Sequence, residues 1–334
     1  SACGCGSASA STRPVSDHSF QNLMLQSLAF VLPVALLCGC SGKGPDPFTE
    51  DVPTKGHVLI LADEGIRPLM ERQEEVFESI YTKAVLDIRY LPAAALLKAM
   101  MNDTVRCTFA SLQTGGEQET WLRSKQRVAR PVPICTDGIA VIANKGRGVK
   151  AMSVQQLRVL LRAGNAWPTW AALDSVSTDR VALVFDGEGS GVMRSLADSL
   201  FPGEAVSLNG LTAAGSAGVV ARVSADPNSI GLLPFSAFSD LDTPAMRLMR
   251  EQVDLVPISA GPDLSLALLP SQSTLADGHY PLRRTLYAIL TEPKSGLGTG
   301  FVSFVAGHKG QRIILKQGLA PQHVPAREVE IVNE

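Results

Sequence analysis

From Gly56 onward the sequence alternates short apolar runs with amphipathic stretches, and this alternation limits the folds that the chain can adopt. The run HVLILAD at 57–63 has the composition of a buried strand, and the stretch behind it places apolar residues on one helical face. Two further strands are expected at 85–91 and 106–111, each followed by a helical stretch. A β-α-β-α-β-α order with short connections is typical of a parallel sheet covered by helices, so we predict an α/β fold.

The alternation is interrupted at 131–145, where PVPICTDGIAVIANK forms one long apolar run that begins with proline. A second α/β block follows it, and the run YPLRRTLYAIL at 280–290 is long enough to return to the first block. Two lobes joined by two crossing strands leave a cleft, and clefts between domains are where small ligands usually bind. We expect lobe I to comprise 56–134 and 280–334, and lobe II to comprise 135–279.

A glycine-rich corner lies in FDGEGSGVMRSLADSLF at 185–201, between an expected strand at 181–184 and an expected helix. Ser190 is a natural N-cap, and Gly189 and Gly191 leave backbone N–H groups uncovered at the positive end of the helix dipole. Such a corner can hold a small anion, although an unliganded surface turn is the alternative. It does not fit the nucleophile-elbow, dinucleotide-binding or Walker patterns, because the glycines or the lysine that they need are absent.

The N-terminal part carries a targeting signal. LAFVLPVALLCGC at 28–40 contains an apolar core of about eleven residues, which suits a signal peptide and is too short to span a bilayer. It ends in a sequence that resembles the bacterial lipobox, whose last cysteine, here Cys40, is lipidated and becomes the mature N-terminus. We therefore expect a leader at 1–39 and a lipidated polar tether at 40–55.

Charge and cysteine usage argue against a nucleic-acid-binding protein and a metalloprotein. The net charge is −2 and no dense run of lysine and arginine occurs, which argues against a nucleic-acid partner. Four of the six cysteines precede residue 41, and the remaining two, Cys107 and Cys135, do not establish a disulfide. Neither a CxxC nor an HExxH motif occurs, so we expect no metal and no cofactor.

Six segments together suggest a family: ILADEGIRPLMERQEEVFESIY, PVPICTDGIAVIANK, SVQQLRVLLRAGNAWPTW, VFDGEGSGVMR, IGLLPFS and YPLRRTLYAILTEPKSGLGTGFVSFVAGHKGQRIILKQGLAP. From about 56 to 332 the chain resembles the substrate-binding lipoprotein of the ABC phosphate transporter, within the type II periplasmic binding proteins. The resemblance implies a two-lobed, hinge-closing fold in which each lobe is a mainly parallel sheet flanked by helices. It also implies a monomeric, non-enzymatic protein, lipid-anchored on the periplasmic side of the cell envelope, that captures inorganic phosphate or a similar oxyanion for an ABC permease.

The resemblance implies ligand contacts at the loop after the first strand and at the glycine corner. The first loop corresponds to Asp63, Glu64 and Gly65, and the corner to Ser190, Gly191 and Val192. With Ile66 and Arg194 added from their positions beside these loops, we expect the ligand residues to be Glu64, Gly65, Ile66, Ser190, Gly191, Val192 and Arg194. Backbone N–H groups at such loops hold an anion whatever the side chains are. Arg67 and Arg194 could add positive charge, with a solvated surface position as the alternative for both.

Three positions depart from the family pattern, because Ala93, Ala110 and Val192 stand where the family has polar residues. Each unmatched lone pair of a desolvated oxyanion costs about 1–3 kcal/mol, so weaker phosphate binding is expected. This favours an alternative function, a sensory or interaction lipoprotein that keeps the fold and has lost tight phosphate binding. A hydrolase that uses Ser190 is a third class, but no patterned histidine accompanies the serine.

Six other side chains carry predictions of their own. Arg283 and Arg284 are expected to alternate in and out of their strand, with one of them partnering a carboxylate near the hinge. Asp63 and Asp137 could each accept a hydrogen bond from a protonated ligand or serve as turn or cap residues, and for Asp137 the structural role is favoured. The pair Trp167 and Trp170 is expected to anchor a helix end in the core rather than to stack on a sugar.

Overall fold

The computed structural model describes residues 51–101, 105–111, 114–162, 168–174, 177–292 and 294–324. Residues 50–334 form one unit, separate from 1–49, and the description below concerns the described residues of that unit. The predicted leader, the lipidation site Cys40 and the side chain of Trp167 lie outside the described residues.

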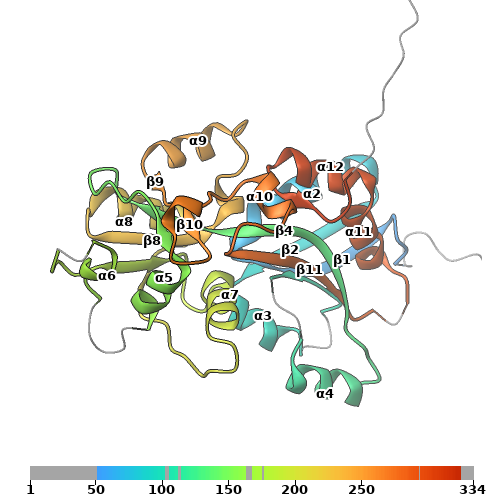
Figure 1. Cartoon of the computed structure of the whole chain (residues 1–334). Helices are drawn as coiled ribbons and strands as arrows, with labels where there is room; N and C mark the ends of the chain where they lie inside the picture. The colour runs from blue at the N-terminus through green and yellow to red at the C-terminus, as the bar shows by residue number, and fades with distance from the viewer. Residues whose placement is uncertain are drawn as a thin grey trace, which may run out of the picture. The chain divides into compact units, whose positions relative to one another are not determined.

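The main sheet runs in the order β2-β1-β3-β11-β4-β8-β6-β7 (Figure 1). β1 (Gly56–Asp63) is parallel to both of its neighbours, β2 (Ala84–Leu91) and β3 (Cys107–Ala110). A second parallel group consists of β8 (Ser229–Pro234), β6 (Ala182–Phe185) and β7 (Leu211–Thr212). The two parallel groups confirm the predicted α/β class.

β4 (Arg130–Ala143) connects the two groups, as Figure 1 shows. Its residues 130–138 pair antiparallel with β11 (Arg283–Leu290), whereas 139–143 pair antiparallel with β8. β11 begins three residues later than predicted, because the chain turns at 281–282. This turn is fastened to the middle of β4: the Tyr280 hydroxyl donates to the carbonyl of Ile139 at 2.7 Å, and the Ile139 amide donates to the carbonyl of Leu282 at 2.8 Å.

Helices cover both faces of the first group of strands. In Figure 1, α2 (Arg67–Ile80), α11 (Leu297–Ala306) and α12 (His308–Lys316) lie together on one side, and α3 (Ala93–Ala99) and α4 (Gly116–Ser124) lie on the other. Phe77, Phe109 and Phe301 meet edge to face between α2, β3 and α11, with ring centroids 5.2 and 5.5 Å apart. Aromatic pairs at such distances add to the stabilisation from burial alone.

The apolar spacing at 298–318 predicts one C-terminal helix, but the structure has two. α11 ends and α12 begins at Gly307, whose backbone is extended. The two helices then approach closely, because a Cβ atom on Gly310 would lie 2.4 Å from the Cα of Val305. A side chain at position 310 would therefore force them apart.

Between β4 and β11 the described part of the chain forms six short helices: α5 (Val154–Leu161), α6 (Ala171–Asp174), α7 (Gly191–Leu200), α8 (Gly215–Ala225), α9 (Pro244–Glu251) and α10 (Gln272–Ala276). The sequence predicts a helix at 153–162 that is capped by Ser153, and α5 begins with this cap. The Ser153 hydroxyl accepts from the Gln156 amide at 3.1 Å, and the Gln156 side chain accepts from the Ser153 amide at 2.8 Å. This reciprocal pair satisfies two amides that the helix itself leaves unpaired.

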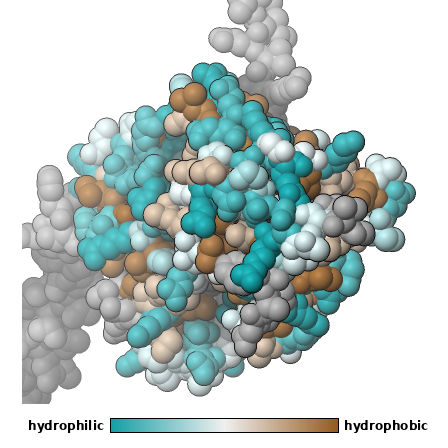
Figure 2. Space-filling model, turned by 90° about the vertical axis from the view of Figure 1, so that its left-hand side faces the viewer, coloured by the Kyte–Doolittle hydropathy of each residue, from teal (hydrophilic) through white to brown (hydrophobic). Residues whose placement is uncertain are grey.

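The remaining elements are short and lie around this frame. They are the strands β5 (Met152–Ser153), β9 (Asp254–Leu255), β10 (Ile258–Ser259) and β12 (Ala320–Pro321), and the 3₁₀ turns η1 (Glu64–Ile66), η2 (Phe235–Ala237) and η3 (Leu264–Leu266). At the end that carries α5, α6 and α8, hydrophilic and apolar residues are interspersed over the surface (Figure 2). Within the described ranges, every helix is too short or too polar to cross a membrane.

Three side chains outside the cleft test predictions from the sequence. Trp170 is buried and its indole N–H donates to the side-chain oxygen of Asn228 at 3.0 Å, which confirms the core role predicted for it. Cys107 and Cys135 are buried as free thiols. Burial raises the pKa of each thiol, so neither is poised to react as a thiolate.

Candidate functional site

The glycine corner forms as predicted. β6 ends at Phe185, the chain passes through Gly189 with a φ of +65°, and α7 begins at Gly191. The Ser190 hydroxyl caps the helix by accepting from the Met193 amide at 3.3 Å. The helix therefore presents its amide-rich N-terminus at the end of a parallel strand, where open α/β sheets bind ligands.

The corner faces the loop after β1 across a closed cleft. The amide of Ala94 in α3 donates to the carbonyl of Gly189 at 3.1 Å, and the hydroxyl oxygen of Ser236 lies 3.4 Å from the carbonyl oxygen of Gly65. These contacts join elements of the first strand group to elements of the second. They bring the two predicted ligand loops to opposite walls of the same site.

Asp63, the last residue of β1, reaches directly to the start of α7. Its Oδ1 accepts from the Gly65 amide at 3.0 Å, which caps η1. A Cβ atom on Gly191 would lie 2.0 Å from its Oδ2 and 3.1 Å from the hydroxyl oxygen of Ser111. Residue 191 must therefore be glycine for the two walls to meet.

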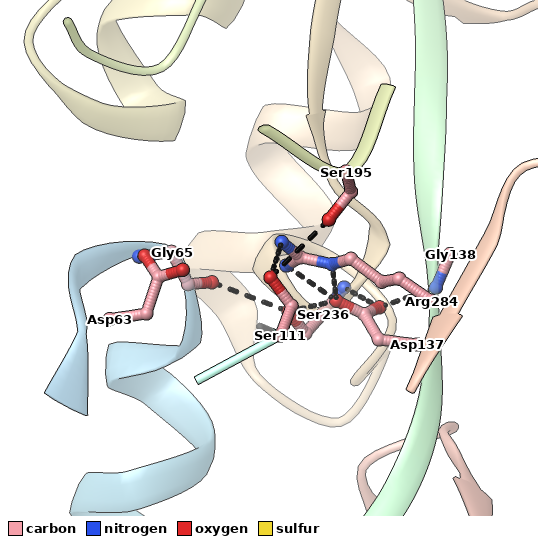
Figure 3. Close-up of polar contacts among 8 residues, drawn as sticks. All are labelled: Asp63, Gly65, Ser111, Asp137, Gly138, Ser195, Ser236 and Arg284. Atoms are coloured by element: carbon pink, nitrogen blue, oxygen red, sulfur yellow. Dashed lines mark hydrogen bonds and ion pairs between the residues drawn. The ribbon is translucent and has the colours of Figure 1, made fainter. Parts of the chain in front are cut away.

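A buried ion pair lies beside this contact, at the point where β4 changes its partner (Figure 3). The Nε and Nη2 atoms of Arg284 donate to Oδ2 of Asp137 at 3.1 and 2.8 Å. Both side chains are buried, whereas Arg283 is exposed, which confirms the predicted alternation of the two arginines. The Arg284 Nη1 atom lies 3.5 Å from the hydroxyl oxygen of Ser111.

Both carboxylate oxygens of Asp137 accept hydrogen bonds from neighbouring groups. Its Oδ1 accepts from the amides of Gly138 and Ser236 at 2.8 and 3.0 Å, and its Oδ2 accepts from the Ser236 hydroxyl at 3.2 Å as well as from Arg284. These bonds cross from β4 to η2 and to β11. Asp137 therefore has the structural role that the sequence favoured, at the junction between the two strand groups.

A third buried carboxylate, Asp186, directly follows β6 and opens the glycine corner. Burial raises its pKa to about 6, against the opposing effects of a hydrogen bond from Ser190 and of the Arg284 charge. Burial also raises the pKa of Asp63, again opposed by Arg284. Within the described residues, no group donates to Oδ2 of Asp63 or to Oδ1 of Asp186.

The predicted ligand residues differ in what they present to the cleft. The Ile66 and Val192 side chains are buried in the core, so these two residues can offer a ligand backbone groups. Glu64 is exposed and pairs with Arg67 at 2.8 Å. Arg194 is exposed and pairs with Asp198 at 2.9 Å, on the outer face of α7.

Two cavities flank the buried carboxylates. One of about 250 Å³ lies between α3 and α7 and is lined by Ala93, Leu97, Ser190 and Arg194 among others. The other, of about 260 Å³, is lined by Glu64, Gly65 and Asp186 together with the first residues of α8. Of the predicted ligand residues, Ser190 and Arg194 line the first cavity, and Glu64 and Gly65 line the second.

The sequence interpretation missed Asp186, Ser195 and Ser236 as cleft residues. Asp186 follows a predicted strand directly, and strand ends are where polar side chains gather in α/β sheets, so its position offered a signal. Ser195 donates to the Ser111 hydroxyl at 3.4 Å from the second turn of α7, and no local pattern marks it (Figure 3). Across the described part of the chain, no group of three or more His, Cys, Asp or Glu side chains could hold a metal ion.

Comparisons with known proteins agree on the fold. The family model of the PBP superfamily domain matches residues 49–309. No curated protein sequence matches the chain significantly.

Solved structures provide the second comparison. A structure described as a phosphate ABC transporter substrate-binding protein with bound phosphate from Clostridium perfringens has a TM-score of 0.65 at 21% identity, over 80% of this chain and 100% of that one. An ABC-type phosphate transport receptor from Vibrio cholerae has a TM-score of 0.61 at 12% identity, over 80% and 100%. A structure described as a possible phosphate binding protein from Planctomyces limnophilus has a TM-score of 0.54 at 17% identity, over 80% and 93%. These proteins share the fold of this chain.

Proposed function

The chain belongs to the PBP superfamily, and from this membership and the cleft we propose that it is a solute-binding protein that captures inorganic phosphate or a similar oxyanion and delivers it to an ABC permease. The observation that carries the proposal is the corner at Ser190 and Gly191, where the N-terminus of α7 enters a closed cleft. Proteins described as phosphate receptors share this fold. The protein captures its ligand without chemical change, as expected of a solute-binding protein rather than an enzyme.

Capture takes place between two lobes of the type II periplasmic binding protein fold. We assign 56–134 and 280–334 to lobe I and 135–279 to lobe II. Support comes from β4, which exchanges β11 for β8 between Gly138 and Ile139, close to this boundary. A strand shared by both lobes and a turn fastened beside it form a natural hinge, because few other segments must bend when the lobes open.

The oxyanion would be held mainly by the backbone. The amides at the start of α7, from Gly191 and Val192, and that of Ile66 in η1 are the proposed donors, with the Ser190 hydroxyl beside them. The Gly65 amide donates to Asp63 in the closed cleft and would have to leave it to join them. An anion at a helix N-terminus is also stabilised by the helix dipole. Arg194 lines the cavity of about 250 Å³ and Glu64 lines the cavity of about 260 Å³. We therefore place both side chains at the entrances to the anion site and not at its centre.

The proposed cellular setting follows from the N-terminal sequence. LCGC at 37–40 suggests that Cys40 carries a lipid and that the protein is anchored in the cell envelope on the periplasmic side. The family resemblance suggests that it is a monomer. Mass spectrometry of the mature N-terminus tests the anchor. A chain that begins upstream of Met24 without a lipid would contradict it.

Titration calorimetry with phosphate, sulfate and molybdate tests the ligand. Gly191→Asp should abolish binding, because it places a carboxylate against both the anion and Asp63. Gly116→Asp is the matched control, since Gly116 is likewise the first residue of a helix but has open space around it. If the wild type binds none of the three anions at millimolar concentration, the transport proposal fails and a sensory or interaction lipoprotein takes its place. If Gly191→Asp binds as tightly as the wild type, the site lies elsewhere in the cleft.

A further inference from the structure

We propose that the cavity of about 250 Å³ between α3 and α7 binds a short carbon chain attached to the oxyanion. The ligand class is then an organic phosphoryl compound, such as an alkylphosphonate or a phosphate monoester. This inference rests on the proposed function, and it adds the chemical class of the ligand. Its basis is the position of the cavity, because the glycine corner and a set of apolar side chains line the same space.

The cavity has a polar end at the glycine corner. Gly189 and Ser190 line it, and Ser190 is the N-cap of α7, where the backbone amides are the proposed anion donors. Arg194 lines the cavity from the next turn of α7 and carries an exposed positive charge. An anion held at the corner would therefore lie beside the cavity, and a group attached to the anion could enter it.

Most of the remaining lining is apolar. It comes from α3, from α7 and from the segment that follows α7: Ala93, Leu97, Met193, Ala197, Val206 and Leu208. Ser207, an exposed residue, adds one further hydroxyl group. A water molecule takes up about 30 Å³ in the liquid, so a chain of several carbon atoms fits in this volume. Sites for small organic ligands typically combine such apolar walls with a few polar groups that fix one end.

The α3 wall shows why a carbon chain suits the cavity better than another oxygen. Ala93 is fully buried and belongs to a small apolar cluster that includes Leu61, Leu96 and Ala110. An oxygen directed at these side chains would lose its water without gaining a donor, which is unfavourable. A methyl or methylene group in the same place carries no such cost and is stabilised by its burial.

Both strand groups contribute to the cavity. The Ala94 amide of α3 donates to the Gly189 carbonyl at 3.1 Å, and a Cβ atom on Gly189 would lie 2.9 Å from the Cβ of Ala94. In the proposed lobe assignment α3 belongs to lobe I and α7 to lobe II. A chain in the cavity would therefore contact both lobes, and its burial would favour the closed cleft over the open one.

Titration calorimetry of the wild-type protein tests the inference with inorganic phosphate and with methyl-, ethyl- and propylphosphonate. Each added methylene should raise the affinity about threefold to fourfold, as expected for burial of that group. Propylphosphonate should therefore bind more tightly than phosphate. Ethyl phosphate matches propylphosphonate in length and should also bind more tightly than phosphate. The tighter of these two compounds identifies the natural class as a phosphonate or an ester.

Ala197→Leu places a larger side chain in the cavity and should lower the ratio of the propylphosphonate affinity to the phosphate affinity at least tenfold. Ala95→Leu is the matched control, because it makes the same change at an exposed position of α3 that does not line the cavity. It should keep the wild-type ratio. Circular dichroism shows whether each variant is folded, and the wild-type series decides the question if one is not.

Two results would overturn the inference and leave the proposed function intact. The first is an affinity that does not rise from phosphate to propylphosphonate in the wild-type protein. The second is an unchanged affinity ratio in folded Ala197→Leu, since the carbon chain would then lie outside the cavity. Absence of binding of phosphate and of every organic compound in the series would instead refute the proposed function.

Discussion

The two walls of the cleft obtain their polar groups in different ways. The α7 wall is local: Ser190 and Gly191 belong to one corner, and its donors are backbone amides. The opposite wall combines Asp63 from β1 with Asp137 from β4 and Arg284 from β11, residues far apart in the sequence. A local wall depends on one strand end and one helix start, whereas the assembled wall depends on the register of several strands. Substitutions on the assembled wall should therefore affect stability most, and those on the local wall should mainly affect binding.

The largest effect is expected from Arg284→Met, which leaves Asp137 buried without its cation. Breaking a buried ion pair from one side destabilises a protein by about 3–5 kcal/mol, and urea unfolding should show a loss of this size. Arg283→Met is the matched control, because the neighbouring side chain is exposed and should change the free energy of unfolding by no more than about 0.5 kcal/mol. Equal losses in the two variants would mean that the assembled wall does not depend on this pair.

Asp186 should make the stability of the folded protein depend on pH. Its pKa of about 6 lies above the value of about 3.9 for an unfolded chain, so the folded state binds the extra proton between these values. The stabilisation is therefore full below about pH 4 and is lost as the pH rises through 6, with a total of about 2–3 kcal/mol. Asp186→Asn should flatten this part of the profile, as measured by urea unfolding from about pH 4 to about pH 7. If the free energy of unfolding of the variant depends on pH as steeply as that of the wild type, the dependence comes from Asp63 or another group.

Much of the fold could be predicted because its signals are local. Alternating apolar runs, the long run at 131–145 and the caps at Ser153 and Ser190 each depend on a few consecutive residues, and all appear in the structure. The break at Gly307 was missed because apolar spacing continues across it. There, close packing of α11 against α12 overrides the helical pattern.

The candidate site was harder to predict, since its charges meet through strand register. The sequence suggested that one of two arginines pairs with a carboxylate, and the antiparallel register of β4 and β11 sets Arg284 opposite Asp137. The approach of Asp63 to Gly191 depends on how the two walls close, which no single segment encodes. Asp186 could have been predicted from its place at a strand end, because the strand that precedes it has a local signal.

Ser190→Ala tests the local wall at its cap. Loss of the bond from the Met193 amide should lower the free energy of unfolding by about 1 kcal/mol. Phosphate affinity should fall by about 1–2 kcal/mol if the hydroxyl also contacts the anion. Ser199→Ala, on the exposed part of the same helix, should leave calorimetric binding and urea unfolding unchanged. If the binding free energy for phosphate falls by the same amount as the free energy of unfolding, the loss is explained by the helix cap, and the hydroxyl does not contact the anion.

The smallest effect is expected from Arg194→Ala, which asks whether the local wall uses side-chain charge at all. The guanidinium is exposed and paired with Asp198 one turn along α7, and such pairs stabilise a helix by about 0.2–0.5 kcal/mol. If the backbone holds the anion, phosphate affinity should change less than about threefold, and the change should vanish at high salt because exposed charges are screened. Calorimetry at two salt concentrations measures both. A loss above tenfold that persists in high salt would mean that Arg194 leaves Asp198 and reaches the ligand, so that the α7 wall recognises the anion through charge as well as backbone amides.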